Sequence, residues 1–349
     1  MGPHGLYQHA DETTPILSEG YCTDDNARAV QLLVHLKTLL PPKQQEETER
    51  LLAICWQYLL DAETNPGTYI NFRSANGQWL PRQPESQDMY ARLVRSLTEV
   101  LVNDTNQHRR LKAKRMLTAL KPKIENFKAP RAWAETLIAL ANLSQTDTAP
   151  LPTKTLISQG YEHLATQWQK NSSLKWPWFE STMTYSNTLF THALLSIAPS
   201  MANSNLPTIL KHSTHFLIQS TIVNNVFMPI GSKGWYPRHG TISRENQQPI
   251  EAGQMFDFLL TYNEVFPEEL APATIAAPYL WFFGLNSSHT ALADPVIGAS
   301  FDGLFSSGPN RHKGAESMLA YLHCEARFAE APPSIRRYIS QQLALLATA

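Results

Sequence analysis

The sequence lacks the features that mark membrane-spanning and secreted chains. No apolar run approaches the roughly 18 residues that a membrane helix needs, although 43 % of the residues are hydrophobic. The first residues do not form a basic segment followed by an apolar one, so the start does not resemble a secretory leader. We therefore expect a soluble protein with a cytoplasmic location.

Cysteine is also scarce, and the net charge is close to zero. The three cysteines, Cys22, Cys55 and Cys324, have neither the spacing of a metal site nor that of a disulfide framework. The 29 basic and 30 acidic residues leave a net charge of −1, which provides no overall basic field for a nucleic acid. These absences argue against a disulfide-rich secreted domain and against a nucleic-acid partner.

The chain does contain enough apolar material for a large core. Only 17 % of the residues are charged, and the 349 residues exceed the usual size of one domain. Closed toroids and barrels nevertheless reach this length as one domain. We expect a single domain over 1–349. Because a polar motif begins almost at the first residues, a fragment of a longer chain is the alternative.

An acidic motif close to the N-terminus is the most informative stretch. Thr23 can cap a helix here, and the helix dipole favours the two acids that follow it, Asp24 and Asp25. A charged helix start is therefore one interpretation. Asn26 and Arg28 add more polar chemistry than a cap requires, which favours a functional site.

Hydrophobic patterning predicts two kinds of helix in alternation. The segment 25–40 carries apolar residues on nearly every face, as a fully buried helix does, whereas 43–62 has a polar start and one apolar side. A basic run at 106–127 is expected to be the solvated face of an outer helix rather than a nucleic-acid patch, because no aromatic residues interleave with its charges. The full set of expected helices is 25–40, 43–62, 87–102, 106–127, 131–143, 154–169, 186–197, 207–221, 250–265, 271–279, 315–328 and 334–347.

These segments form six pairs whose first members start about 58 residues apart on average. A repeat of this kind needs its neighbours to bury its apolar face. The pattern predicts an all-α fold, an (α/α)6 toroid of six inner and six outer helices with short strands or loops at the mouth. An open helical solenoid is the alternative. The polar and aromatic residues collect ahead of the inner helices, which favours the toroid.

Tryptophan is concentrated in the expected loops. Five of the eight tryptophans lie there: Trp79, Trp176, Trp178, Trp235 and Trp281. Flat apolar sugar faces stack on aromatic rings, while sugar hydroxyls bond to amides and carboxylates. We expect four of these rings (all but Trp176) to surround one mouth of the toroid. The alternative makes each tryptophan a loop anchor packed on the core.

The polar residues beside these rings are the candidate sugar ligands. The predicted substrate-binding residues are Asp24, Asn26, Arg28, Asn71, Trp79, Asp88, Arg92, Arg131, Trp178, Tyr185, Asn187, Trp235, Gln247, Gln248, Asp302 and Glu316. No phosphate-cradling glycine loop, nucleophile elbow or metalloprotease motif competes with this interpretation.

Three carboxylates are the candidates for catalysis. Glu180 lies in a tryptophan-rich loop, where the loss of water contact favours the protonated form that a general acid needs. Asp25 and Glu251 lie at expected helix starts, where the dipole favours the ionised form that suits a base or a substrate ligand. The His, Cys and carboxylate residues have no convincing metal-ligand spacing, so we expect no metal and no cofactor. Ca²⁺ bound through acidic loops is the alternative.

The motifs together resemble a known family, the glycosidase-like (α/α)6-toroid domains of the six-hairpin glycosidase superfamily, which also occur attached to glycosyltransferases. The stretches that carry the resemblance are 20–29, 71–72, 130–133, 178–180 with Tyr185, 229–235, 247–252 and 314–317. The chain departs from the family pattern at 85–88 and 245–246. The resemblance spans nearly the whole chain and implies inversion as the stereochemical outcome of any hydrolysis.

The sequence thus predicts a carbohydrate-active protein, in the first place a glycoside hydrolase that acts on a short oligosaccharide by carboxylate acid–base chemistry. Its expected partners are an oligosaccharide or glycoside substrate and, in a longer protein, a glycosyltransferase domain. A non-catalytic sugar-binding module that serves a glycosyltransferase is the main alternative. A sugar epimerase is a weaker one, because the sequence shows no clear two-histidine arrangement.

Overall fold

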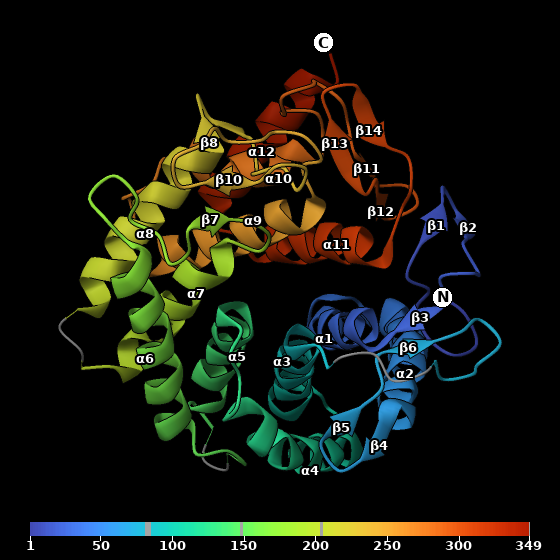
Figure 1. The fold of residues 1–349 in the computed structure, drawn as a ribbon. Helices are drawn as coiled ribbons and strands as arrows, with labels where there is room; N and C mark the ends of the chain where they lie inside the picture. The colour runs from blue at the N-terminus through green and yellow to red at the C-terminus, as the bar shows by residue number, and fades with distance from the viewer. Residues whose placement is uncertain (81–84, 147–148, 203–204, 349) are drawn as a thin grey trace. The chain divides into compact units, whose positions relative to one another are not determined.

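The computed structural model describes residues 1–80, 85–146, 149–202 and 205–348. Within these residues the protein is mostly helical, with only short strands between the helices (Figure 1). The chain forms two compact units: unit 1 comprises 1–10, 14–167 and 192–206, and unit 2 comprises 11–13, 168–191 and 207–349. The prediction of a single domain stays a prediction.

Twelve α-helices lie in the described part of the chain. They are α1 (Thr23–Leu39), α2 (Pro42–Ala62), α3 (Gln87–Asn103), α4 (Gln107–Ile124), α5 (Pro130–Leu143), α6 (Thr153–Asn171), α7 (Thr188–Ile197), α8 (Leu206–Thr221), α9 (Pro249–Val265), α10 (Pro272–Trp281), α11 (Ala315–Glu330) and α12 (Pro333–Leu346). Each expected helix therefore exists, with ends within about three residues of those predicted. Several start at proline, which suits the first helical turn because the missing N–H is not needed there.

The strands are short and pair two by two. Their bounds are β1 (Ala10–Asp11), β2 (Thr14–Pro15), β3 (Tyr21–Cys22), β4 (Glu63–Asn65), β5 (Thr68–Tyr69), β6 (Phe72–Arg73), β7 (Thr182–Met183), β8 (Ile222–Val223), β9 (Val226–Phe227), β10 (Tyr236–Pro237), β11 (Ala293–Asp294), β12 (Ala299–Ser300), β13 (Gly303–Phe305) and β14 (Gly308–Asn310). The pairs are β1–β2, β3–β6, β4–β5, β7–β10, β8–β9, β11–β12 and β13–β14.

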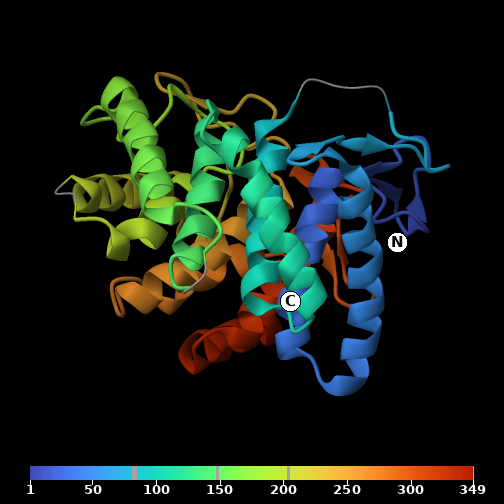
Figure 2. The same ribbon diagram turned by 90° about the horizontal axis from the view of Figure 1, so that it is seen from below.

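In unit 1, helices α1, α3 and α5 pack side by side, and α2 and α4 pack against α1 and α3 respectively. α1 and α2 form an antiparallel hairpin with a short connection (Figures 1 and 2). α4 buries Ala113, Met116, Leu117 and Leu120 and carries most of its basic residues on the opposite side. This confirms the expectation that the basic run is the outward face of a helix.

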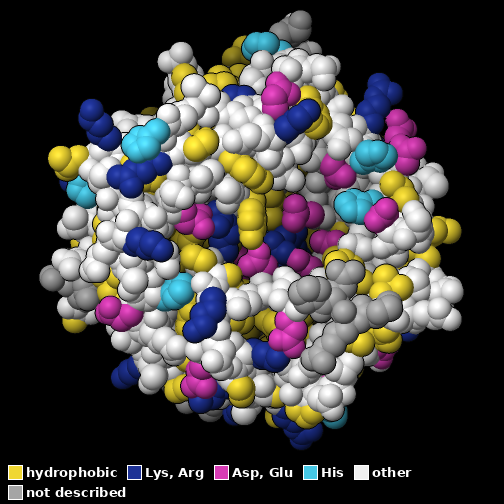
Figure 3. All heavy atoms as spheres, in the orientation of Figure 1, with side chains coloured by type: hydrophobic (Ala, Val, Ile, Leu, Met, Phe, Trp, Pro, Cys, Tyr) yellow, Lys and Arg dark blue, Asp and Glu magenta, His cyan; other side chains and the backbone are white. Residues whose placement is uncertain are grey.

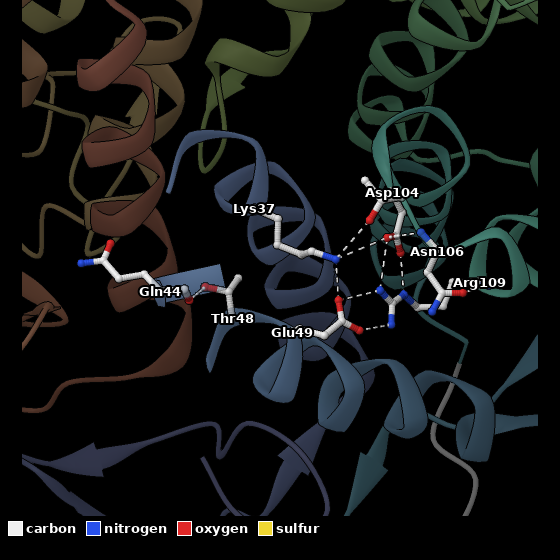
Figure 4. A network of polar contacts seen from close by, with 8 residues as sticks. Lys37, Gln44, Thr48, Glu49, Asp104, Asn106 and Arg109 are labelled. Atoms are coloured by element: carbon white, nitrogen blue, oxygen red, sulfur yellow. Dashed lines mark hydrogen bonds and ion pairs between the residues drawn. The ribbon is translucent and has the colours of Figure 1, made fainter. Parts of the chain in front are cut away.

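Arg109 is the exception, because it enters a buried ion-pair network (Figure 4). Its Nε lies 2.5 Å from Asp104 Oδ2, and its Nη1 lies 2.5 Å from Glu49 Oε1. Lys37 completes the network, with Nζ 2.5 Å from Glu49 and 3.7 Å from Asp104. The network joins the last part of α1 to α2, to the end of α3 and to the start of α4, and it combines two cations with two anions.

In unit 2, α9 packs against α10 and α11, and α10 packs against α12. α9 is buried over most of its length, whereas α12 buries only Ile335 and Ile339. α10, the second helix of its pair, is also buried from Ile275 to Trp281, so the expected alternation holds for α11 and α12 but not for α9 and α10. On the face drawn in Figure 3, acidic and basic side chains are interspersed, in agreement with the near-zero net charge.

The start of α1 differs in detail from the prediction. Cys22 rather than Thr23 is the N-cap, and its Sγ accepts a hydrogen bond from the backbone N–H of Asp25 at 3.4 Å. Thr23 lies in the first helical turn, and its hydroxyl donates to the carbonyl of Ile70 at 2.6 Å. The hydroxyl ties the helix start to a remote loop, a contact that the local sequence does not reveal.

Candidate functional site

The first turn of α1 presents the two predicted acids in different surroundings. Asp25 is buried, and its Oδ2 accepts a hydrogen bond from the thiol of Cys22 at 3.0 Å. Burial raises the pKa of this thiol well above its usual value, and the neighbouring Asp25 and Asp24 raise it further. Cys22 is therefore a neutral donor to Asp25 rather than a nucleophile.

Asp24 is half-buried and joins α1 to α3. Its carboxylate accepts a hydrogen bond from Arg92 and lies 3.5 Å from Arg28 Nε. Arg28 also lies 3.8 Å from Asp25, so one guanidinium faces both acids. The structure therefore brings together four predicted residues: Asp24, Asp25, Arg28 and Arg92.

Two residues that the sequence analysis missed extend this cluster to α5. Arg95 Nη1 donates to Glu135 Oε1 at 2.8 Å, and both side chains are largely buried. Burial by itself would raise the pKa of Glu135, but Arg95, Arg92 and Arg28 outweigh it and hold this pKa below its usual value. We call the six residues Asp24, Asp25, Arg28, Arg92, Arg95 and Glu135 the arginine–carboxylate cluster; it spans α1, α3 and α5.

Arg131 and Asp88 belong to the same helices as this cluster. Arg131 is buried in the first turn of α5, four residues before Glu135. Asp88 is half-buried in the first turn of α3, four residues before Arg92. Because residues four apart share a helix face, Arg131 lies on the same face of α5 as Glu135, and Asp88 on the same face of α3 as Arg92. The charged faces of both helices therefore continue toward the helix starts.

Asn26 has a structural role. It is fully buried, and its Oδ1 accepts a hydrogen bond from the backbone N–H of Leu6 at 2.8 Å. Its amide nitrogen donates to the carbonyls of Cys22 at 2.8 Å and Leu6 at 3.4 Å. The side chain therefore pins the N-terminal segment to α1, which corrects its assignment as a sugar ligand.

Asn71 and Trp79 lie on the loop that follows α2. The backbone carbonyl of Asn71 accepts from Thr23 N–H at 2.7 Å, and its buried Oδ1 has no hydrogen-bond partner among the described residues. The half-buried ring of Trp79 packs edge-on against Tyr58, and the Arg73 guanidinium lies 5.0 Å from its centre. Trp79 is therefore not fully buried, and its role as a sugar ligand stays a prediction.

The tryptophans of unit 2 divide into core and surface rings. Trp178 and Trp281 are fully buried and Trp176 nearly so. Trp178 packs edge-to-face against Phe179 and Phe190. The expectation that Trp178 and Trp281 offer ring faces to a ligand is therefore wrong for this structure. Trp178 is a loop anchor packed on the core, as the alternative predicts, whereas Trp281 is the last residue of α10 rather than a loop residue.

Glu180 follows this aromatic core directly. Its side chain is half-buried, and its backbone carbonyl accepts a hydrogen bond from Trp176 Nε1 at 2.7 Å. β7 begins two residues later. The carboxylate thus lies where a rigid aromatic base meets the surface of unit 2.

The turn between β7 and α7 is held by α9. Ser186 has a left-handed backbone, with φ of +48°, a conformation that residues other than glycine seldom adopt. Its backbone N–H donates to the carboxylate of Glu251, which is only 6 % exposed. Asn187 is also buried and donates to the carbonyl of Thr184 at 2.6 Å, whereas Tyr185 between them is exposed.

Trp235 lies on the long loop before α9 and is half-buried. Its backbone is left-handed as well, with φ of +56°. The bonds that hold it run from Trp235 N–H to Gly231 O at 3.1 Å and from Ser243 N–H to Trp235 O at 2.9 Å. A bulky residue in this conformation is a real outlier, and such strain is concentrated at functional sites.

Gln247 uses its amide within the protein. The amide nitrogen donates to Arg244 O at 3.1 Å and to Ser287 Oγ at 2.9 Å, and the amide oxygen accepts from Trp281 Nε1 at 3.2 Å. Gln247 is only 1 % exposed, so its amide stabilises the surrounding loops and is not placed to bind a sugar. The neighbouring Gln248 is half-buried at the start of α9 and makes no side-chain cap bond there.

Asp302 and Glu316 lie at the start of α11. Asp302 Oδ1 accepts from Gly314 N–H at 2.5 Å, which fixes the residue that caps α11. Glu316 is half-buried in the first turn of this helix, where the dipole favours an anion. Both carboxylates therefore have local structural reasons to be present.

The described residues contain no group of three or more His, Cys, Asp or Glu side chains arranged to hold a metal ion. In the same part of the chain, no helix is long and apolar enough to cross a membrane. Neither finding changes the predictions about cofactors and location.

The fold has relatives among solved structures, although no family model and no curated protein matches the sequence. The cellobiose 2-epimerase of Spirochaeta thermophila superposes with a TM-score of 0.68 at 13 % identity, over 97 % of this chain and 91 % of that one. The cellulase Cel9M of C. cellulolyticum does so with a TM-score of 0.62 at 10 % identity, over 94 % and 88 %. The chain therefore shares the fold of these two proteins.

An α-1,6-mannanase of Salegentibacter, solved with α-1,6-mannotriose, extends this likeness. Its TM-score is 0.59 at 9 % identity, over 95 % of this chain and 94 % of that one. The (α/α)6-toroid class predicted from the sequence is thereby confirmed. Because this fold is shared by hydrolases and epimerases, it does not by itself decide the reaction.

Proposed function

We propose that the protein is carbohydrate-active and hydrolyses a glycosidic bond in a short oligosaccharide. The observation that carries the proposal is its six-hairpin glycosidase fold, shared over most of its length with proteins named for cellobiose, cellulose or mannan. The acids at the starts of α1, α9 and α11 support it, since glycoside hydrolysis depends on carboxylates.

Glu180 is the proposed proton donor. Hydrolysis requires one protonated carboxyl beside the leaving oxygen. Glu180 is half-buried at the edge of an aromatic core made by Trp176, Trp178 and Phe179. A rigid base of this kind holds a side chain in the narrow geometry that proton transfer demands.

A second carboxylate must activate water or attack the sugar. Asp25 and Glu251 are the candidates for this role. Asp25 accepts from the Cys22 thiol and faces the Arg28 guanidinium, two contacts that favour its ionised form. Glu251 accepts from a backbone N–H, a contact that also favours the ionised form. We expect inversion at the anomeric carbon, as the resemblance implies.

The second candidate function is a non-catalytic sugar-binding module attached to a glycosyltransferase. One observation favours it: Asp24, Asp25, Glu251 and Asp302 all accept hydrogen bonds from groups of the protein itself. Such carboxylates support a structure without any chemistry. Binding would then depend on aromatic residues that are not fully buried, such as Tyr185 and Trp235 of unit 2. In either case we keep an oligosaccharide as the partner and a cytoplasmic location as proposals.

The test is an incubation of the protein with a panel of short oligosaccharides that includes cellobiose and α-1,6-mannotriose. Products are separated by chromatography, and calorimetry measures binding to the same sugars. Glu180→Gln should abolish turnover and leave binding within about twofold, because the amide cannot donate the proton. Glu162→Gln, on the exposed side of α6, is the matched control and should retain turnover.

Three results separate the candidates. Products that disappear in Glu180→Gln support the hydrolase. Binding without products supports the module. Full turnover in Glu180→Gln removes Glu180 as the acid.

A further inference from the structure

The turn at 184–187 in unit 2 is irregular and contains the candidate ligand residue Tyr185. Three side chains fix it. Glu251 accepts from Ser186 N–H, Gln254 Nε2 donates to Ser186 Oγ at 3.3 Å, and Asn187 Nδ2 donates to Thr184 O at 2.6 Å. Glu251 and Gln254 come from one helix, α9, one turn apart.

These hydrogen bonds offset the conformational cost of the left-handed backbone at Ser186. A left-handed backbone at a residue with a Cβ is unfavourable by roughly 1 kcal/mol, and Ser186 is buried, so water cannot satisfy its N–H. A buried carboxylate is one of the strongest acceptors that the chain can offer to such an N–H. Without Glu251, Ser186 would lose the bond that compensates for its left-handed backbone.

The turn determines the position of Tyr185, which lies within it. β7 and β10 pair antiparallel, with Met183 opposite Tyr236 and Thr182 opposite Pro237. Tyr185 follows the end of β7 by two residues and Trp235 directly precedes β10, so both lie at the same end of this antiparallel ladder. An exposed aromatic residue and a half-buried one, from two segments, therefore flank one end of this ladder.

We propose that Glu251 is a positioning residue: its carboxylate clamps the left-handed turn at Ser186 and thereby sets Tyr185 beside Trp235 as an aromatic platform for a sugar ring. The role of the platform rests on the proposed function, whereas the clamp does not. This inference gives Glu251 a role different from direct catalysis. Paired aromatic side chains suit the flat apolar face of a pyranose.

The first experiment measures the clamp without any sugar. Hydrogen exchange of the peptide that contains Ser186 is compared in the parent protein and in the variants Glu251→Ala and Glu251→Gln. Exchange of the Ser186 amide should accelerate about tenfold or more in the alanine variant, because a charge-assisted hydrogen bond is lost. The glutamine variant keeps an acceptor oxygen and should remain close to the parent.

Glu264→Ala is the matched control on the same helix. Glu264 is exposed at the far end of α9 and should not affect Ser186. Thermal melting identifies any variant that does not fold, and the glutamine variant keeps the test valid if the alanine variant fails. Unchanged exchange in a folded Glu251→Ala protein would overturn the clamp.

The second experiment separates positioning from catalysis. Binding of cellobiose and α-1,6-mannotriose is measured for Glu251→Ala alone and combined with Ser186→Gly. Glycine adopts a φ of +48° without a Cβ penalty, so it should restore most of the lost binding. Glu251→Gln should bind both sugars within about threefold of the parent, since amide oxygens also accept hydrogen bonds.

The outcomes distinguish this inference from the proposed function. Unchanged sugar binding in a folded Glu251→Ala protein whose Ser186 exchange has accelerated would overturn the positioning role. If the parent binds neither sugar, that result counts against the proposed function and the platform, and the exchange data alone decide the clamp.

Discussion

Removal of one charge from the buried network of unit 1 provides the sharpest test of the fold's energetics. The change is Asp104→Asn, which keeps the size of the side chain. Asp104 has no exposed side-chain surface and accepts from Arg109 Nε at 2.5 Å and from Asn106 N–H at 2.9 Å. In the variant, Lys37 and Arg109 would share a single carboxylate, that of Glu49 (Figure 4).

The expected loss follows from the cost of an uncompensated buried charge. Breaking a buried ion pair typically costs about 3–5 kcal/mol. Because Glu49 still contacts Arg109, we expect the lower end, about 3 kcal/mol. For a unit of this size, that loss lowers Tm by about 6–12 °C. Thermal unfolding followed by circular dichroism at pH 7 measures it.

The pH dependence supplies a second readout of the same variant. Although burial favours the neutral acid, bonds from Arg109 and from Asn106 N–H hold the pKa of Asp104 below its usual value. The stabilisation is therefore fully present above the unfolded-state pKa of about 3.9 and is lost as the pH falls through the lower folded-state value. The difference in Tm between parent and variant should shrink below about pH 4.

The control for this prediction is an exposed pair on α2. Arg50 and Glu47 form an ion pair with side chains 59 % and 60 % exposed. Glu47→Gln should leave Tm unchanged within error, because exposed pairs contribute little. If Asp104→Asn melts with the parent at pH 7, the network does not stabilise unit 1. If the difference in Tm persists undiminished at pH 2, the ionised form of Asp104 is not its source.

Three further predictions concern other parts of the chain. The cysteines should react with a disulfide reagent only after unfolding, because burial raises the pKa of Cys55, for example, to about 12; rapid labelling of the folded protein would contradict this. Gly67→Ala should destabilise the protein by about 2 kcal/mol more than Gly308→Ala in urea unfolding: both glycines have positive φ, but only at Gly67 would a Cβ meet the carbonyl of Ala119, at 2.2 Å. Dialysis against a chelator should leave sugar binding unchanged, and a loss restored by Ca²⁺ would show that a metal is required.

The helices could be predicted from the sequence because their signals are local. Proline at the first helical turn of α2, α5 and α9 marks their starts, and the spacing of apolar residues gives the buried faces. The period of the six pairs then leaves few architectures that bury those faces. For the same reason the basic face of α4 was assigned correctly.

The surroundings of individual side chains could not be predicted in the same way. Whether a loop tryptophan points inward depends on what lies beneath it: Trp178 packs on Phe190, whereas Trp235 remains half-buried. Asn26 gave no sign that it would bond to Leu6, because that contact joins residues twenty positions apart. Such contacts arise only once distant segments pack together.

One part of the candidate site was readable from the sequence and was missed. Arg92 and Arg95 are three residues apart on α3, and Glu135 follows Arg131 by four on an otherwise apolar helix. Residues at these spacings share a helix face. Charged residues that share the face of a buried helix require partners, so the Arg95–Glu135 pair could have been inferred.

The most direct test of the central claim is a crystal structure of the Glu180→Gln variant soaked with a sugar panel that includes cellobiose and α-1,6-mannotriose. The expected result is a bound sugar with a glycosidic oxygen within hydrogen-bond distance of the residue 180 side chain and a ring stacked on Tyr185 or Trp235. A sugar bound away from these residues, or no bound sugar from any member of the panel, would contradict it.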